Sequence, residues 1–100
     1  MRVVFSRQAL AELDDILGFI TPNNPDGSAR VHAQIRRAIE RIGQYPEGAQ
    51  QVAGREAVRR VPLVRYPYVI YYEAGAGEVT ILRILHGARR QPWRGEDEGR

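Results

Sequence analysis

The spacing of the apolar residues changes once along this chain, just after Pro46, and this change constrains the fold more than any other feature. Before Pro46, apolar residues recur every three or four positions, as on the buried side of a helix. Beyond Arg55 they alternate and are rich in aromatic and β-branched types, as in strands. We therefore predict an α+β protein in which a helical segment precedes most of the strands.

The N-terminal half is predicted to start with a strand over residues 1–5, followed by a helix from Arg7 to about Ile20. Ser6 is the predicted cap of this helix, because its hydroxyl can accept a hydrogen bond from an amide of the first turn. The predicted buried stripe consists of Leu10, Leu13, Ile16, Leu17 and Ile20. Glu12, Asp14 and Asp15 are predicted to face solvent.

A turn rich in proline, asparagine and glycine, residues 21–27, ends the first helix. Asp26 or Ser28 is predicted to cap a second helix that runs to about Tyr45. Because the connection is short, the two helices should form an antiparallel hairpin. The predicted buried stripe of the second helix is Val31, Ile35, Ala38, Ile39 and Ile42, and its solvent face is Arg36, Arg37, Glu40 and Arg41.

Three further strands are predicted after a polar connection over residues 47–55. They span Ala57–Leu63, Tyr68–Tyr72 and Val79–Leu85, and residues 73–78 form a hairpin turn between the last two. The element order is thus β-α-α-β-β-β. We predict that the N-terminal strand and the helical hairpin pack with a mainly antiparallel four-stranded sheet. Residues 1–93 are predicted to be a single domain, and residues 94–100 a flexible charged tail.

The composition excludes several kinds of site. There is no cysteine, and the two histidines, His32 and His86, do not have the spacing of metal ligands, so no metal or other cofactor is predicted. There is no glycine-rich phosphate loop and no serine placed as a nucleophile. No apolar run approaches the roughly 20 residues needed to cross a bilayer. We expect a cytoplasmic protein without membrane contact.

Every basic residue is an arginine, and the arginines are unevenly placed. Residues 1–50 carry six arginines and six acids, whereas residues 51–90 carry seven arginines and three acids. Arginines on the predicted strands and just beyond them can share one surface: Arg59, Arg60, Arg65, Arg83 and Arg89. Such a surface can bind the phosphates of a nucleic acid, receive an acidic protein segment, or simply lie in solvent with a few salt bridges.

His86 is predicted to lie where the last strand breaks at Gly87. An imidazole at that position can act as an acid or base near neutral pH, or can serve only as a strand end bonded to backbone. His32 is predicted to lie on the flank of the second helix, half exposed and without a functional role.

The residues from Arg59 to Glu73, with Tyr66-Pro67-Tyr68 at their centre, and those from Val79 to Arg89, ending in Leu85-His86-Gly87-Ala88-Arg89, resemble the C-terminal half of RelE/ParE toxins. The opening Phe5-Ser6-Arg7-Gln8-Ala9, followed by an acidic helix and a second helix that closes near Tyr45-Pro46, is similar to the N-terminal half of that superfamily. The resemblance covers roughly residues 1–93.

The resemblance implies a toxin of a type II toxin–antitoxin system, of which two kinds are known. RelE-like members are ribosome-dependent endoribonucleases that cut mRNA, whereas ParE-like members inhibit DNA gyrase. Arg59 and Arg89 match basic positions of the ribonucleases. Tyr68 stands where the ribonucleases have an arginine on the middle strand. Their C-terminal tyrosine is absent from this sequence, in which Trp93 is the nearest aromatic residue.

These departures favour a ParE-like, plasmid-stabilisation type of toxin, which has no catalytic residues of its own. On that interpretation the target-binding candidates are Arg59, Arg60, Arg65, Arg83, His86, Arg89, Arg90 and Trp93. If the protein is instead an mRNA endoribonuclease, the catalytic candidates are Arg59, His86 and Arg89. A third hypothesis is that the protein only binds its antitoxin, in which case its expression without the antitoxin would not arrest growth.

The resemblance also implies the partners. The protein is expected to form a hetero-oligomer with a cognate antitoxin, ParD-like or similar, whose acidic tail folds onto the toxin. DNA gyrase is the expected target, and the ribosome with its mRNA is the target in the alternative.

Substitution Arg89→Ala is expected to relieve growth arrest while leaving the fold and antitoxin binding intact, because Arg89 is predicted to contact the target. Growth after induced expression, with circular dichroism of the purified variant, measures this. Loss of folded protein would instead make Arg89 a structural residue.

Overall fold

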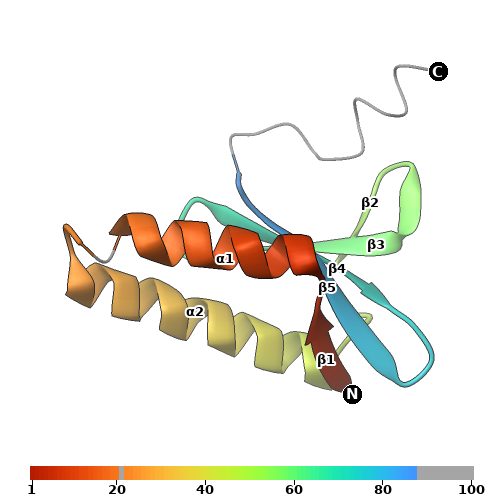
Figure 1. The fold of residues 1–100 in the computed structure, drawn as a ribbon. Coiled ribbons are helices and arrows are strands. Elements are labelled where there is room, and N and C mark those ends of the chain that lie inside the picture. Colours follow the sequence, from red (N-terminus) through yellow and green to blue (C-terminus); the bar gives the residue numbers. More distant parts are fainter. Residues whose placement is uncertain (21, 88–100) are drawn as a thin grey trace.

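Two helices pack side by side against one face of a five-stranded sheet (Figure 1). The computed structural model describes residues 1–20 and 22–87. In chain order the elements are β1 (Arg2–Phe5), α1 (Arg7–Ile20), α2 (Pro25–Gln44), β2 (Gln50–Val52), β3 (Arg55–Pro62), β4 (Tyr68–Ala74) and β5 (Glu78–His86). The predicted α+β class, with an N-terminal strand and a helical hairpin, is confirmed. The predicted tail over residues 94–100 lies outside the described residues.

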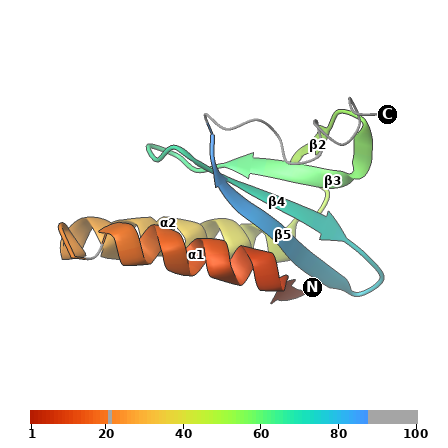
Figure 2. The ribbon, with the colours of Figure 1, turned by 45° about the horizontal axis from the view of Figure 1, so that its top comes forward.

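The strands lie in the order β1-β5-β4-β3-β2. β1 pairs with β5 in parallel, and every other neighbouring pair is antiparallel. Figure 2 shows the helices on one side of this sheet and the β2–β3 hairpin curling at its far edge. The first strand is therefore joined to the last one, and the helical hairpin crosses over the sheet between them.

The prediction of four strands was wrong by one, because β2 was assigned to the polar connection. β2 has only three residues, and two of them are the exposed glutamines Gln50 and Gln51. Its pairing with β3 also shifts register between Gln51 and Val52. A strand this short and polar shows no alternation of apolar residues, so only its hydrogen bonding to β3 defines it.

Side-chain caps fix where both helices begin. Ser6 caps α1 as predicted, since its Oγ accepts from the Ala9 amide at 3.0 Å. The predicted caps of α2, Asp26 and Ser28, were wrong, because the Asn24 side chain accepts from the Gly27 amide at 2.8 Å. Pro25 then occupies the first turn, where its missing N–H costs nothing. The asparagine–proline pair is thus the start signal of α2.

The main core lies between the helices and the sheet. Its fully or nearly fully buried members are Ala9, Val31, Ile35, Ile42, Leu63, Ile70, Tyr72, Val79, Ile81 and Ile84. The predicted stripe of α2 is confirmed, with Ala38 and Ile39 partly buried beside it. Neither α1 nor α2 is long and apolar enough to span a bilayer.

The predicted stripe of α1 was partly wrong. Leu10 is 49% exposed, whereas Ala9 is completely buried. Ala9 shares its face with Leu13, Ile16 and Leu17, at the spacing of successive turns, and Leu10 lies about 100° further round the helix. The Ile20 side chain lies outside the described part of the structure.

A second apolar cluster lies on the sheet face opposite the helices: Val52, Val58, Val69, Tyr71 and Leu85. Successive residues of β4 alternate between the two clusters, so this strand is buried on both faces. That double burial explains why Tyr68–Tyr72 carries the strongest strand signal in the sequence.

Substitution Ile35→Ala is expected to lower the free energy of unfolding by about 2–5 kcal/mol, because Ile35 is 1% exposed and its loss leaves a cavity. Leu10→Ala on the neighbouring helix is the matched control and should cost about 0.5 kcal/mol or less. Urea denaturation measures both. Equal costs would contradict the placement of α1 given above.

Candidate functional site

Two of the predicted site residues, Arg65 and His86, lie at one end of the sheet, where β3 and β5 end and β4 begins. His86, the last residue of β5, pairs with Tyr68, and the two rings meet edge to face at 5.9 Å. The Gly87 amide donates to the Pro67 carbonyl at 2.5 Å, which holds the β3–β4 loop beside the end of β5. We call Val64, Arg65, Tyr68 and His86 the sheet-end surface.

The β3–β4 loop presents an apolar and a basic side chain to solvent. Val64 is 68% exposed, and Arg65 beside it is exposed as well. Arg65 has φ 70°, a left-handed conformation that costs a residue with a Cβ roughly 1–2 kcal/mol. Backbone strain of this kind persists only where the surrounding structure imposes the conformation.

A pocket of about 350 Å³ opens beside this surface, between α1 and the end of β5. It is lined by Glu12, Asp15, Ile16, Tyr68, Ile84, Leu85 and His86. Within residues 1–20 and 22–87, no three histidine, aspartate or glutamate side chains are grouped so that they could hold a metal ion. The pocket therefore offers polar groups to a ligand but no metal centre in the described chain.

Arg83 is engaged inside the protein by Glu12. Its Nη2 lies 2.6 Å from Glu12 Oε2, and its Nε donates to the same oxygen at 2.9 Å. The other Glu12 oxygen accepts from the Ile84 amide at 2.9 Å. Both side chains are largely buried, 24% and 15% exposed. The prediction that Glu12 faces solvent was wrong.

Glu12 is drawn inside the protein because one edge of β5 is left open. β1 pairs with β5 only as far as Ile81, so the backbone groups of β5 beyond Ile81 that point away from β4 have no strand to pair with. Ser6 donates to the Leu82 carbonyl at 2.8 Å, and Glu12 accepts from the Ile84 amide. The start of α1 thus satisfies the groups that β1 leaves open.

Arg59 is engaged as well, on the helix-facing side of the sheet. Its Nη1 donates to the Ala49 carbonyl at 2.6 Å, and Tyr72, opposite it on β4, donates to the Pro46 carbonyl at 2.7 Å. Burial raises the pKa of Tyr72, and the nearby Arg59 guanidinium offsets part of that rise. Both side chains anchor the connection between α2 and β2.

Arg59 and His86 do not meet. Arg59 pairs with Tyr72 and His86 pairs with Tyr68, so they differ by four residues along β4 and lie on opposite sides of it. From standard strand rise and spacing, their Cα atoms are roughly 16 Å apart.

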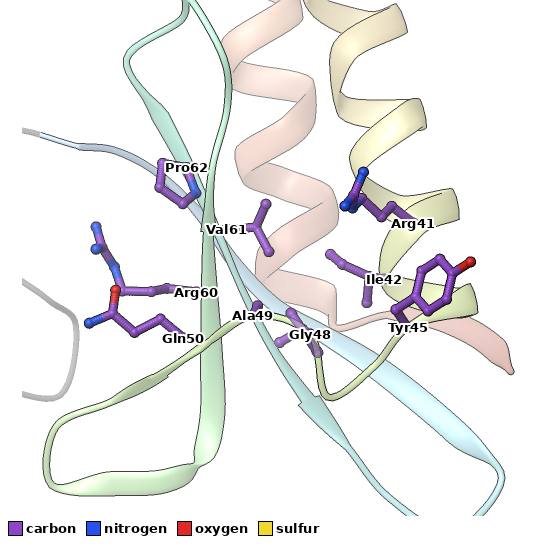
Figure 3. Close-up of a pocket in the computed structure, with 10 residues that line it drawn as sticks. Arg41, Ile42, Tyr45, Gly48, Ala49, Gln50, Arg60, Val61 and Pro62 are labelled. Atoms are coloured by element: carbon purple, nitrogen blue, oxygen red, sulfur yellow. The ribbon is translucent and has the colours of Figure 1, made fainter.

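Arg60 points to the opposite face from Arg59, since it pairs with Tyr71 of the second cluster. Figure 3 shows it beside Gln50 and directed away from Arg41. Its Nε is buried without a hydrogen-bond partner in the described chain. The structure therefore does not bring the predicted arginines together on one surface, because Arg59, Arg60, Arg65 and Arg83 each lie in a different environment. Arg89, Arg90 and Trp93 lie outside the described residues. His32 is exposed on α2.

A second described pocket was not foreseen from the sequence. It has a volume of about 640 Å³ and lies between the C-terminal part of α2 and β3 (Figure 3). We call it the α2–β3 groove; its walls include Arg41, Ile42, Tyr45, Ala49, Val61 and Pro62. No sequence pattern predicts that α2 and β3 lie side by side. The one local indication of a binding surface is Tyr45, an aromatic residue at the end of a basic helix face.

Residues 3–91 match the family model of the ParE toxin of the type II toxin–antitoxin system, parDE. The protein therefore belongs to the ParE toxin family, which confirms the resemblance to RelE/ParE toxins.

Individual relatives and one solved structure are similar over most of the chain. The protein is 33% identical to Y4kP of Sinorhizobium fredii over 92 residues, which is 91% of this chain and 93% of that protein. It is 34% identical to Toxin RelE2 of Caulobacter vibrioides over 88 residues, 88% of this chain and 97% of that one. A solved structure described as the chromosomal ParDE TA system from P. aeruginosa superposes with a TM-score of 0.74 at 25% identity, covering 86% of this chain and 95% of that one.

Substitution Glu12→Gln is expected to lower the free energy of unfolding by about 1–3 kcal/mol, because it removes the charge that Arg83 pairs with in a partly buried setting. The matched control is Arg2→Gln, which breaks the looser and more exposed pair with Glu78, 3.9 Å apart, and should cost about 0.5 kcal/mol or less. Urea denaturation at neutral pH compares the two. If both variants lose equally little, the Glu12–Arg83 pair is no stronger than a surface pair.

Proposed function

We propose that this protein is a toxin that acts by binding DNA gyrase, that it does not cut RNA, and that a cognate antitoxin neutralises it. The observation that carries the proposal is the separation of the residues a nuclease would need. Arg59 and His86 lie roughly 16 Å apart, and Arg59 is held by the Ala49 carbonyl.

Cleavage of RNA requires a base within about 3 Å of the 2′-hydroxyl and a cation at the same phosphate. Arg59 and His86, on either side of β4 and four residues apart along it, would have to span most of the separation of their Cα atoms with their side chains to meet at one phosphate, and the Arg59 guanidinium is held by the Ala49 carbonyl instead. Tyr68, which stands where the ribonucleases place an arginine, packs its ring against His86. That contact gives both residues a packing role at the sheet end.

The sheet-end surface has the composition of a protein contact. An exposed valine beside an exposed arginine combines an apolar anchor with a planar cation, and arginine is enriched at protein interfaces. We therefore place the target contact at Val64 and Arg65, joined by His86. Arg89, Arg90 and Trp93 follow Gly87 in the sequence and are proposed as further target-binding residues on the family resemblance alone.

Family membership supports an antitoxin partner, since the matched family and the P. aeruginosa structure are both described as parts of a ParDE system. The net charge of +3 suits a partner with an acidic segment. A toxin of bacterial gyrase acts in the cytoplasm, which is where we place the protein. The alternative, a ribosome-dependent endoribonuclease, is supported by the match of Arg59 and Arg89 to basic positions of the ribonucleases and by similarity to the Caulobacter protein named Toxin RelE2.

Two parallel assays on the purified chain separate these functions. We expect it to inhibit gyrase-dependent supercoiling of plasmid DNA and to leave mRNA intact on translating ribosomes. Relaxation of the same plasmid by a topoisomerase I, and mRNA without ribosomes, are the controls. Cleaved mRNA with normal supercoiling would overturn the proposal and return Arg59, His86 and Arg89 to catalytic candidates.

The variant Arg65→Gly tests the sheet-end surface in the same assay. Glycine adopts φ 70° without strain, so the variant should remain folded with an unchanged or higher melting temperature. Its inhibition of supercoiling should nevertheless weaken by roughly tenfold, which corresponds to about 1.4 kcal/mol of binding. Undiminished inhibition would remove Arg65 from the target contact.

A further inference from the structure

The pocket between α1 and the end of β5 combines carboxylates, aromatic rings and aliphatic side chains. We call it the α1–β5 pocket; its lining consists of Glu12, Asp15, Ile16, Tyr68, Ile84, Leu85 and His86. Its volume of about 350 Å³ is at the lower end of the roughly 300–1,000 Å³ that ligand sites occupy. The pocket therefore has room for one small group rather than for a folded segment of a partner.

The helix wall of the α1–β5 pocket carries a carboxylate without a partner. Glu12, Asp15 and Ile16 are three and four residues apart, so they are neighbours on the side of α1 that meets β5. The Glu12 carboxylate is neutralised by Arg83. Asp15 is exposed, and among residues 1–20 and 22–87 it has no ion-pair partner. Its negative charge is therefore available to a ligand.

The strand wall presents two aromatic rings. Tyr68 and His86 are paired across β4 and β5 and meet edge to face, with their centroids 5.9 Å apart and their planes at 81°. This contact occupies one face of only one ring, and both residues also line the pocket. The faces of aromatic rings carry partial negative charge and attract cations. The aromatic wall thus favours the same sign of ligand charge as Asp15 does.

The rest of the lining is aliphatic. Ile84 is 1% exposed and Leu85 7%, and Ile16 is partly buried against the main core. Such a surface suits a ligand whose charge lies at the end of a hydrocarbon stem, because the stem can stay on apolar surface while the head reaches a carboxylate. Arginine and lysine side chains have this form. Within the described part of the chain, no basic side chain of the protein lines the pocket except the His86 imidazole.

We propose that the α1–β5 pocket binds a guanidinium group, and that this group is an arginine side chain of the protein target. The stem lies against Ile16 and Ile84, and the planar head pairs with the Asp15 carboxylate and stacks on the Tyr68 ring. A guanidinium forms paired hydrogen bonds with a carboxylate and stacks on aromatic rings, whereas the compact, strongly hydrated ammonium of lysine suits these contacts less well.

The assignment of the arginine to the target rests on the proposed function, whereas the chemistry of the pocket does not. The pocket shares Tyr68 and His86 with the sheet-end surface, on which Arg65 is exposed. A target at this end of the sheet therefore meets a negative charge at Asp15 and a positive charge at Arg65. Charges of both signs in one contact fix the orientation of a partner, because reversed docking brings like charges together.

The first experiment titrates the isotope-labelled full chain with N-acetyl-arginine methylamide, whose side chain carries its only charge. We expect saturable shifts in the NMR signals of the Asp15, Ile84 and His86 amides at millimolar concentrations of this compound. The matched control compound is the citrulline analogue, which has nearly the same shape but no charge and should give no saturable shift. Added salt should weaken the binding of the arginine compound, because Asp15 is exposed.

Two pairs of variants locate the binding. Asp15→Asn should weaken the affinity for the arginine compound by roughly tenfold, because it removes the charge from the acceptor. Asp14→Asn makes the same charge change on an exposed residue about 100° round α1 and should leave the affinity unchanged. Tyr68→Leu should also weaken binding, whereas Tyr68→Phe keeps the ring and should retain it. Circular dichroism checks that each variant is folded.

The supercoiling assay separates the two sources from which a guanidinium group can come. If the target supplies it, Asp15→Asn should weaken the inhibition of gyrase by roughly tenfold, and Asp14→Asn should not. Full inhibition by Asp15→Asn, together with weakened binding of the arginine compound, would contradict the assignment to the target. The pocket would then be a site for a free guanidino compound.

No saturable binding, equal binding of the citrulline analogue, or an equal loss of affinity in Asp14→Asn would each refute the inference as a whole. These outcomes are distinguishable from failure of the proposed function, because the titration contains only the chain and the small compound. A chain that binds the arginine compound but leaves supercoiling unaffected would count against gyrase as the target and not against the pocket.

Discussion

The parallel pairing of β1 with β5 is the constraint on which the rest of the structure depends. It joins elements that are far apart in the sequence; the hydrogen bond between Ser6 and the Leu82 carbonyl next to this pairing spans 76 residues. Once the two strands are paired, the helical hairpin between them has to cross the sheet, and its apolar stripe covers one face of β4 and β5. The position of α1 beside β5 follows directly, because only Ser6 separates the end of β1 from the start of α1.

That geometry also decides what the charged residues can do. β1 is too short to cover the whole of β5, and Glu12 takes over where it stops. Arg83 is drawn into this contact and becomes part of the scaffold rather than of a binding surface. Arg59 is likewise committed to the connection after α2. Some of the arginines that suggest a nucleic-acid surface in the sequence therefore stabilise the edges of the sheet instead.

The sequence allowed the elements to be predicted wherever local patterns decide them. Val31, Ile35 and Ile42 repeat at helical spacing, Ser6 stands directly before an amphipathic segment, and the residues from Tyr68 to Tyr72 suit a strand buried on both faces. β2, the exposed Leu10 and the buried Glu12 could not be predicted, because each is set by a neighbour distant in the chain. The same holds for the candidate site: the β3–β4 loop that carries Arg65 lies beside His86 through the contact of Gly87 with Pro67 and the pairing of Tyr68 with His86, and the α2–β3 groove exists because β3 lies across from Arg41. Family membership could be predicted from the sequence alone, because it depends on motifs and not on contacts.

The pairing of β1 with β5 has a consequence for synthesis in the cell. The ribosome releases β1 and both helices well before β5, so for much of translation β1 has no partner and the helical hairpin has no sheet to cover. The pairing of β1 with β5 can form only after β5 has been synthesised, and a chain that stops before β5 lacks His86 and with it part of the sheet-end surface. Until β5 is made, no complete sheet-end surface exists for another protein to contact.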